Sequence, residues 1–156
     1  MTKLALTVLF LVVSAIAFAA EADHRFIQLL HLPITMESVV VAEGDLEPRS
    51  IGSYSLCIYG GRSEKFPTDD FITGTVRPRN GTIEAVRFDD LDGDNRPDVI
   101  VVMRSAGSGG YLAADAFRYQ NGALELIGSV AGLDKATDPI EALRDQLKPL
   151  TGVEGN

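Results

Sequence analysis

Residues 98–130 read DVIVVMRSAGSGGYLAADAFRYQNGALELIGSV, and this stretch decides the fold class. Three runs in it are rich in β-branched, aromatic or alternating apolar residues: Asp98–Arg104, Tyr111–Tyr119 and Ala123–Val130. Such runs favour β-strands, and the Asn121-Gly122 pair between the last two favours the positive φ angles of a tight hairpin turn. The stretch therefore predicts consecutive antiparallel strands.

The same pattern continues upstream. Five further strands are predicted, at Phe26–Leu32, Ser38–Glu43, Ser53–Tyr59, Phe71–Arg77 and Thr82–Phe88. Turn residues separate them, and Asn80-Gly81 again predicts a hairpin. Short strands at such regular spacing favour an antiparallel β-sandwich, with a flattened barrel as the alternative.

One segment near the C-terminus, DPIEALRDQLKPL (138–150), has helical spacing instead. Asp138 is the expected N-cap and Pro139 takes the first helical position, while Ile140, Leu143 and Leu147 share one stripe. The predicted fold is therefore all-β: an antiparallel β-sandwich of about eight strands with a short C-terminal helix.

The N-terminus predicts export. Lys3 precedes the uncharged apolar run LALTVLFLVVSAIAFAA, which ends in small residues. This is typical of a secretory signal over residues 1–19, with cleavage after Ala22 as the alternative, although a retained membrane anchor would have a similar pattern. The predicted domain is then 20–156, and 156 − 19 = 137 residues remain.

The single cysteine refines that prediction. A lipid-anchored bacterial protein needs a cysteine at its cleavage site, and Cys57 lies far downstream. We therefore expect a soluble periplasmic protein without membrane contact after cleavage. Cys57 is expected to be a small buried hydrophobe, with a disulfide between two chains as the alternative, so monomer and homodimer both stay open.

The charge balance limits the class of partner. The chain has 14 Lys and Arg against 22 Asp and Glu, and loss of Lys3 with the signal gives 13 − 22 = −9. Nucleic acid is disfavoured, because Lys and Arg must neutralise its phosphates. Such a charge would speed encounter with a cationic protein, while solubility alone is the alternative explanation.

An aspartate-rich loop, DLDGDNRPD, spans Asp90–Asp98. Its candidate calcium ligands are Asp90, Asp92, Asp94, Asp98 and the backbone carbonyl of Arg96. Ca²⁺ takes six to eight oxygens, which alternate carboxylates plus a carbonyl can supply, so Ca²⁺ is the one candidate cofactor, in a structural role. The alternative is a solvated turn whose aspartates accept backbone N–H groups.

A glycine-rich segment, RSAGSGGY, follows the next predicted strand. Three glycines in four residues cannot comfortably continue a strand, so we expect a protruding polar loop. Its polar side chains are Ser105, Ser108 and Tyr111, and the glycines, Gly107, Gly109 and Gly110, let the backbone approach another surface closely.

Catalytic interpretations of this loop fail on the sequence. A serine hydrolase needs a helix after the nucleophile and a histidine downstream, but His24 and His31 both lie upstream. A phosphate loop needs a Lys-Ser/Thr ending or an opening helix, and zinc needs a His and Cys spacing that is absent from the sequence. We therefore predict that the protein is not an enzyme and has no catalytic residues.

Residues 89–117, DDLDGDNRPDVIVVMRSAGSGGYLAADAF, resemble the signature region of the periplasmic inhibitors of invertebrate-type (i-type) lysozyme, and residues 39–55 fit the same family. The resemblance implies a periplasmic β-sandwich that blocks a muramidase secreted by animal hosts. In that family a serine and a tyrosine three residues apart, on a protruding loop, enter the lysozyme cleft. The matching positions here are Ser108 and Tyr111.

The resemblance leads to a contact hypothesis. We expect the Ser108 and Tyr111 hydroxyls to bond the two lysozyme carboxylates, with the three glycines permitting the turn. Arg104 and Ser105 are expected to brace the loop, with direct contact as the alternative. Two rival functions are a calcium-stabilised carbohydrate-binding or adhesin-like exported module, and a structural domain in which the loop is a connector.

Overall fold

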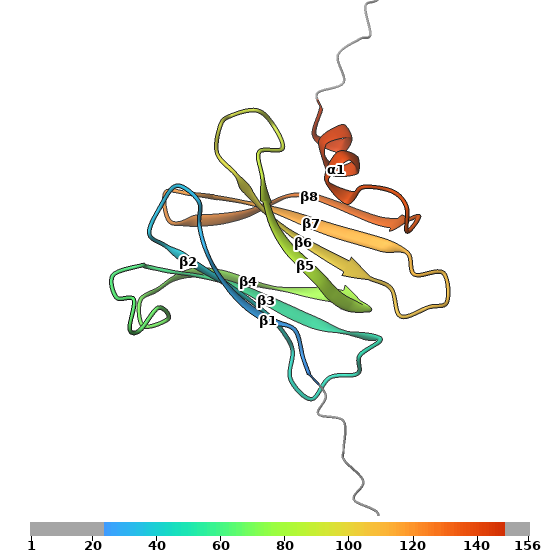
Figure 1. Cartoon of the computed structure of the whole chain (residues 1–156), viewed down its shortest axis with the longest axis horizontal. Coiled ribbons are helices and arrows are strands. Elements are labelled where there is room, and N and C mark those ends of the chain that lie inside the picture. The colour runs from blue at the N-terminus through green and yellow to red at the C-terminus, as the bar shows by residue number, and fades with distance from the viewer. Residues whose placement is uncertain (1–23, 149–156) are drawn as a thin grey trace, which may run out of the picture.

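Two antiparallel sheets of four strands each, with one short helix, make up residues 24–148, the part of the chain that the computed structural model describes (Figure 1). The predicted signal, residues 1–19, and both candidate cleavage positions lie outside these residues. Within them, no helix is long and apolar enough to cross a membrane.

All eight predicted strands are present, and their ends differ from the predictions by a few residues at most. The bounds are β1 Ile27–His31, β2 Ser38–Glu43, β3 Ile51–Tyr59, β4 Phe71–Asn80, β5 Thr82–Asp89, β6 Asp98–Arg104, β7 Leu112–Gln120 and β8 Ala123–Leu133. The first sheet has the order β1-β2-β3-β4 and the second β5-β6-β7-β8. The two sheets do not close into a barrel, so the sandwich prediction is confirmed.

The two Asn-Gly pairs behave differently. Asn121 and Gly122 both have positive φ, at 53° and 76°, and they connect the paired strands β7 and β8 as predicted. The hairpin prediction at Asn80-Gly81 is wrong, because β4 pairs with β3 and β5 pairs with β6. Gly81 is instead the corner at which the chain passes from the first sheet to the second.

The second sheet is covered on both faces. Its inner face packs against the first sheet through residues such as Val99, Val101 and Phe117. Its outer face is covered by α1, Pro139–Leu147, whose Ile140 and Leu143 pack in the same cluster as Ile100 and Val102 of β6. Double coverage explains why β6 is a continuous apolar run. Asp138 caps α1 as predicted, accepting from the Ile140 N–H at 2.9 Å.

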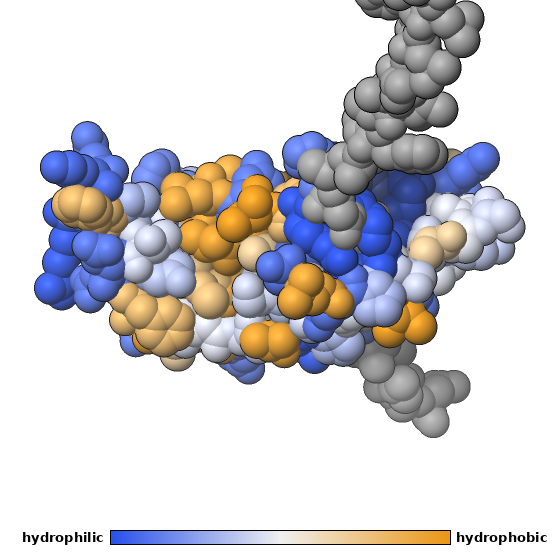
Figure 2. Space-filling model, turned by 90° about the horizontal axis from the view of Figure 1, so that it is seen from below, coloured by the Kyte–Doolittle hydropathy of each residue, from blue (hydrophilic) through white to orange (hydrophobic). Residues whose placement is uncertain are grey.

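The outer face of the first sheet has no such cover among the described elements. Ile27 and Val76 are 73% and 68% exposed there, and Figure 2, seen from the side of this sheet, shows apolar side chains gathered in the middle of the face. Cys57 of β3 is half-buried and pairs with Gly74 of β4. It therefore does not lie in the core, where the sequence places it.

The register places the loops at two opposite ends of the sandwich. Ile51 pairs with Asn80, and Thr82 pairs with Arg104, so the ends of these strands meet at the Gly81 corner. Residues 44–50 and 105–111 therefore lie at one end, which we call the Gly81 end (Figure 1). The aspartate loop lies at the other end, about 20 Å away along β6.

A buried carboxylate joins the two sheets across the core. Asp115 of β7, 3% exposed, accepts hydrogen bonds from Tyr54 Oη of β3 at 2.6 Å and from Ser129 Oγ of β8 at 2.6 Å. Arg77 of β4 completes the site, with Nε at 3.3 Å from an Asp115 oxygen. Burial, and then the hydrogen bond to Asp115, raise the pKa of Tyr54 far above its usual value.

Replacement of Tyr54 by Phe tests this link. We expect Tyr54→Phe to lower the free energy of unfolding at pH 7 by about 1–3 kcal/mol, because Asp115 loses a donor while staying buried. The Tyr54 pKa is raised on folding, so this stabilisation is complete below about pH 10 and declines at higher pH.

Urea denaturation at pH 7 and above pH 10 measures both effects. The gap between wild type and Tyr54→Phe should narrow at the higher pH, and a constant or wider gap would contradict the prediction. Tyr111→Phe is the matched control, because that side chain is 52% exposed and its hydroxyl has no hydrogen bond within the described residues.

Candidate functional site

The glycine-rich loop, residues 105–111, leaves the sheet where β6 and β7 are still paired. Arg104 faces Leu112 across the last pair of the ladder. One further backbone bond closes the base of the loop, from Ser105 N to Tyr111 O at 2.8 Å, and Gly110 N donates to Gly107 O at 3.1 Å across its tip. The loop is therefore a short, closed projection from the Gly81 end.

Arg104 braces this projection. Its Nη1 donates to Gly110 O at 3.0 Å, while Nε and Nη2 form a two-pronged ion pair with Glu84 of β5, at 2.7 and 2.8 Å. Bidentate arginine pairs fix orientation as well as adding energy. The guanidinium therefore links the loop backbone to the neighbouring strand β5. Its contacts are within this chain, as the bracing hypothesis expects.

Ser105 contributes through its backbone. Its N–H closes the loop base, whereas its Oγ is buried and has no hydrogen-bond partner within the described residues.

The three glycines serve different purposes. Gly110 has φ +57°, a left-handed conformation that an L-residue adopts only at a cost. A Cβ at Gly109 would overlap the Tyr111 ring, which lies against the backbone there. A Cβ at Gly107 would meet nothing within 4 Å. Only the first two positions therefore constrain the shape of the loop.

The two hydroxyl groups expected to contact lysozyme are available. Ser108 is exposed and Tyr111 is 52% exposed. Neither hydroxyl is engaged by another group within residues 24–148. The structure therefore presents a serine and a tyrosine hydroxyl on one braced loop, both free to bond an external group.

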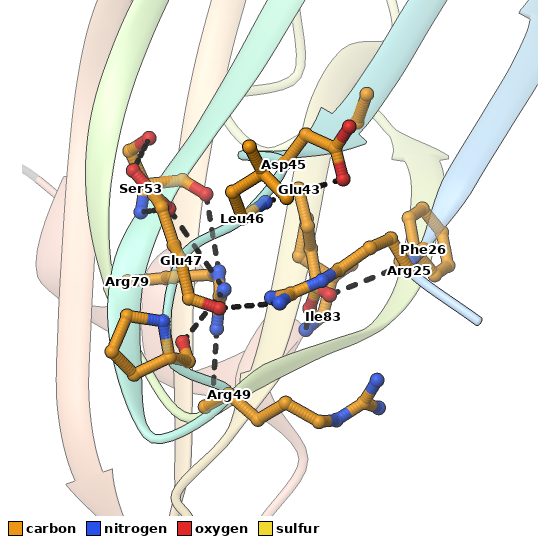
Figure 3. A network of polar contacts seen from close by, with 12 residues as sticks. Arg25, Phe26, Glu43, Asp45, Leu46, Glu47, Arg49, Ser53, Arg79 and Ile83 are labelled. Atoms are coloured by element: carbon orange, nitrogen blue, oxygen red, sulfur yellow. Dashed lines mark hydrogen bonds and ion pairs between the residues drawn. The ribbon is translucent and has the colours of Figure 1, made fainter. Parts of the chain in front are cut away.

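A second loop, residues 44–50, stands at the same end and was not singled out from the sequence. Arg79 of β4, 2% exposed, holds it: Nε donates to Ser53 O at 3.1 Å, Nη1 to Arg49 O at 2.9 Å and Nη2 to Pro48 O at 3.1 Å (Figure 3). Arg79 Nη1 also donates to Gly81 O. No sequence signal marks this arginine, because it lies in a stretch, TVRPRN (75–80), where polar and apolar residues mix and a second arginine lies two residues before it.

Glu43 and Glu47 extend this network. Glu43 is buried and accepts from Ile83 N at 2.7 Å, which joins β2 to the second sheet. Glu47 accepts from the backbone N–H and the hydroxyl of Ser53, and these bonds lower the pKa of its carboxyl.

The aspartate loop brings three of its four predicted carboxylates together. Oxygens of Asp90, Asp92 and Asp94 lie within 4.8 Å of one another. Asp90 also accepts hydrogen bonds from the backbone N–H groups of Gly93 at 2.8 Å and Asn95 at 2.8 Å. These are the bonds that the alternative hypothesis, a solvated turn, predicts. The same carboxylates can therefore cap the turn and face a cation.

Asp98 is placed differently from the other three aspartates. It is 2% exposed, and its oxygens lie 3.5 Å from Arg118 Nε and 3.4 Å from Leu91 N. Burial raises its pKa to about 6, against the opposing effect of Arg118. Arg118 Nη2 also pairs with Asp92 at 2.5 Å, so the same arginine contacts Asp98 and one member of the carboxylate cluster.

Comparison with known proteins now identifies the family. Residues 24–147 match the family model described as periplasmic lysozyme inhibitor of I-type lysozyme. No curated protein sequence matches the chain.

Two solved structures are similar to the chain. The periplasmic inhibitor of I-type lysozyme (PliI) of Aeromonas hydrophila is 45% identical, with a TM-score of 0.71, and the match covers 76% of this chain and 98% of that one. The Aeromonas hydrophila inhibitor in complex with Meretrix lusoria lysozyme is 46% identical, with a TM-score of 0.70 and coverage of 76% and 95%.

These matches agree with the predictions of a periplasmic location and of a protein that is not an enzyme. The family match extends over nearly all of the described residues, including both loops at the Gly81 end and the aspartate loop. This chain belongs to the family of periplasmic inhibitors of I-type lysozyme.

Proposed function

We propose that this chain inhibits i-type lysozyme by inserting the loop 105–111 into the active-site cleft of the enzyme, and so protects the cell wall from host lysozyme. The observation that supports this best is the pair of unengaged hydroxyls, on Ser108 and Tyr111, carried by a closed and braced projection. A solved complex of a 46% identical inhibitor with Meretrix lusoria lysozyme supports the class of partner.

The chemistry of the cleft suits these hydroxyls. Lysozymes cleave with a protonated carboxylic acid and a second carboxylate a few ångströms apart. A hydroxyl can donate to a carboxylate and can also accept from a carboxylic acid, so Ser108 and Tyr111 can satisfy both groups. The inhibitor has no bond in this loop that resembles a glycosidic link, and it therefore occupies the cleft without being cleaved.

Rigidity should make the insertion favourable. The bond from Ser105 N to Tyr111 O and the Arg104 contact fix the loop before it meets a partner. Less conformational entropy is then lost when the loop binds, so more of the contact energy appears as affinity.

Removing the two hydroxyls tests the proposal. We expect Ser108→Ala and Tyr111→Phe each to weaken inhibition about ten- to hundredfold, since a hydrogen bond to a charged group is worth about 1.5–3 kcal/mol. Tyr111→Ala should cost more, because the ring is lost as well. The measurement is the inhibition constant against Meretrix lusoria lysozyme digesting bacterial walls.

Thr68→Ala provides the control, because it removes an exposed hydroxyl from the loop at the opposite end of the sandwich. Full potency of a folded Ser108→Ala, Tyr111→Ala double variant would place the inhibitory site elsewhere. Failure of the wild-type protein to inhibit at micromolar excess would refute the function itself.

The glycines offer an independent test of loop shape. Gly110→Ala forces a Cβ into a left-handed position, at a cost of about 1–2 kcal/mol, so it should weaken inhibition roughly tenfold. Gly107→Ala adds the same methyl group in open space and should weaken inhibition less. Equal effects of the two substitutions would show that the left-handed turn is not needed for binding.

We also propose that the aspartate loop binds Ca²⁺ in a structural role. The support is the convergence of Asp90, Asp92 and Asp94, three hard oxygen donors on one turn. Arg118 competes for Asp92, so the ion would have to displace or share that contact.

A melting curve with excess Ca²⁺ and one with chelator test this second proposal. Calcium at about 100 times its Kd should add about 2.7 kcal/mol and raise the melting temperature by several degrees. Asp90→Asn should abolish the increase, whereas Asp45→Asn, an exposed aspartate at the other end, should preserve it. Identical midpoints with and without Ca²⁺ would leave the aspartates as turn residues.

A further inference from the structure

We propose that Leu46, at the tip of the loop 44–50, is a second contact on the lysozyme, beside the cleft that receives the loop 105–111. This inference rests on the proposed insertion of that loop. It assigns to Leu46 an apolar contact that strengthens binding and that the two hydroxyls cannot provide.

The two loops share one support. Gly81 N donates to Ser50 O, at the end of the loop 44–50, over 2.7 Å. On its other side Gly81 lies so close to Arg104 O and the Ser105 Cα that a Cβ would overlap both. The same residue therefore touches the base of each loop, so the two loops leave the sandwich side by side and a partner that binds one loop can reach the other.

The conformation and the exposure of Leu46 do not contribute to the stability of the fold. Its side chain is 96% exposed, and its backbone has φ +60°, in the left-handed region. A bulky L-residue is disfavoured there, and an exposed leucine gains nothing from the core. A strained, exposed apolar residue is a reason to suspect a function.

The loop 44–50 is nevertheless held rigidly (Figure 3). Arg79 binds two of its carbonyl groups, Glu47 accepts two hydrogen bonds from Ser53, and Gly44 N donates to Ser53 O at 2.9 Å. Arg25 donates to the Glu47 carbonyl as well. Leu46 is thus displayed on a fixed frame, which limits the entropy lost when a partner covers it.

The partner surface that fits is an apolar patch on the rim of the lysozyme cleft. A leucine side chain gains by leaving water for such a patch. The exposed Asp45 beside it would direct a basic group of the enzyme to the edge of the contact. Leu46 would then lie at the centre of a small apolar contact with a polar rim.

Substitution of Leu46 separates binding from stability. Leu46→Gly removes the side chain and relieves the left-handed backbone, so it should raise the melting temperature or leave it unchanged. The same change should weaken binding to Meretrix lusoria lysozyme about ten- to hundredfold, measured by calorimetry. Leu46→Ala should weaken binding similarly, without the gain in stability.

Ile34→Ala is the matched control: Ile34 is also largely exposed, but on the loop between β1 and β2 at the opposite end. Unchanged binding by Leu46→Gly, or equal losses for Leu46→Ala and Ile34→Ala, would overturn the inference. If Ser108→Ala weakens binding and Leu46→Gly does not, the insertion of the loop 105–111 is supported and the Leu46 contact is refuted. If the wild-type protein does not bind lysozyme, both the proposed function and the Leu46 contact are refuted.

Discussion

Arg79 buries a positive charge inside the sandwich, and the backbone of the Gly81 end depends on which groups accept hydrogen bonds from it. A guanidinium cannot lose its proton in a protein, so burial obliges the chain to surround it with acceptors. Carbonyl groups of Pro48, Arg49, Ser53 and Gly81 do so. Pro48, Arg49 and Gly81 lie outside the strands, so the charge holds backbone carbonyl groups that strand pairing does not.

This constraint reaches the glycine-rich loop through one residue. Gly81 accepts from Arg79 and packs, without a side chain, against the base of the loop that bears Ser108 and Tyr111. A buried ion is weak support for stability, because apolar residues of similar volume often serve as well. An apolar side chain at position 79 could fill the space, but it could not fix four carbonyl groups. We infer that the charge serves to position the loops.

The sequence predicted the strands well because each one carries a local signal, in apolar alternation or in Asn-Gly turns. It misplaced the turn at Asn80-Gly81, since the same dipeptide suits a hairpin and a corner between sheets, and partner choice depends on contacts distant in sequence. The glycine-rich composition predicted a polar loop that carries Ser108 and Tyr111, whereas their assignment as the lysozyme contacts came from a resemblance. Leu46 and Arg79 were missed because neither an exposed leucine nor a strand arginine is unusual until its backbone angle or burial is known.

The opposite ends of the sandwich have different chemical characters, and β6 connects them. Its apolar run is buried on both faces, so it is fixed along its length between the aspartate loop and the glycine-rich loop. At one end charged groups pair with each other, as Arg118 does with Asp92 and Asp98. At the Gly81 end Arg79 and Arg104 each face a carboxylate too, Glu47 and Glu84, but both arginines also donate to backbone carbonyl groups of a loop. The hydroxyls of the glycine-rich loop tip have no partner within residues 24–148. The proposed inhibition depends on that arrangement, because a hydroxyl already hydrogen-bonded within its own chain, or a leucine already buried there, is not available to contact an enzyme.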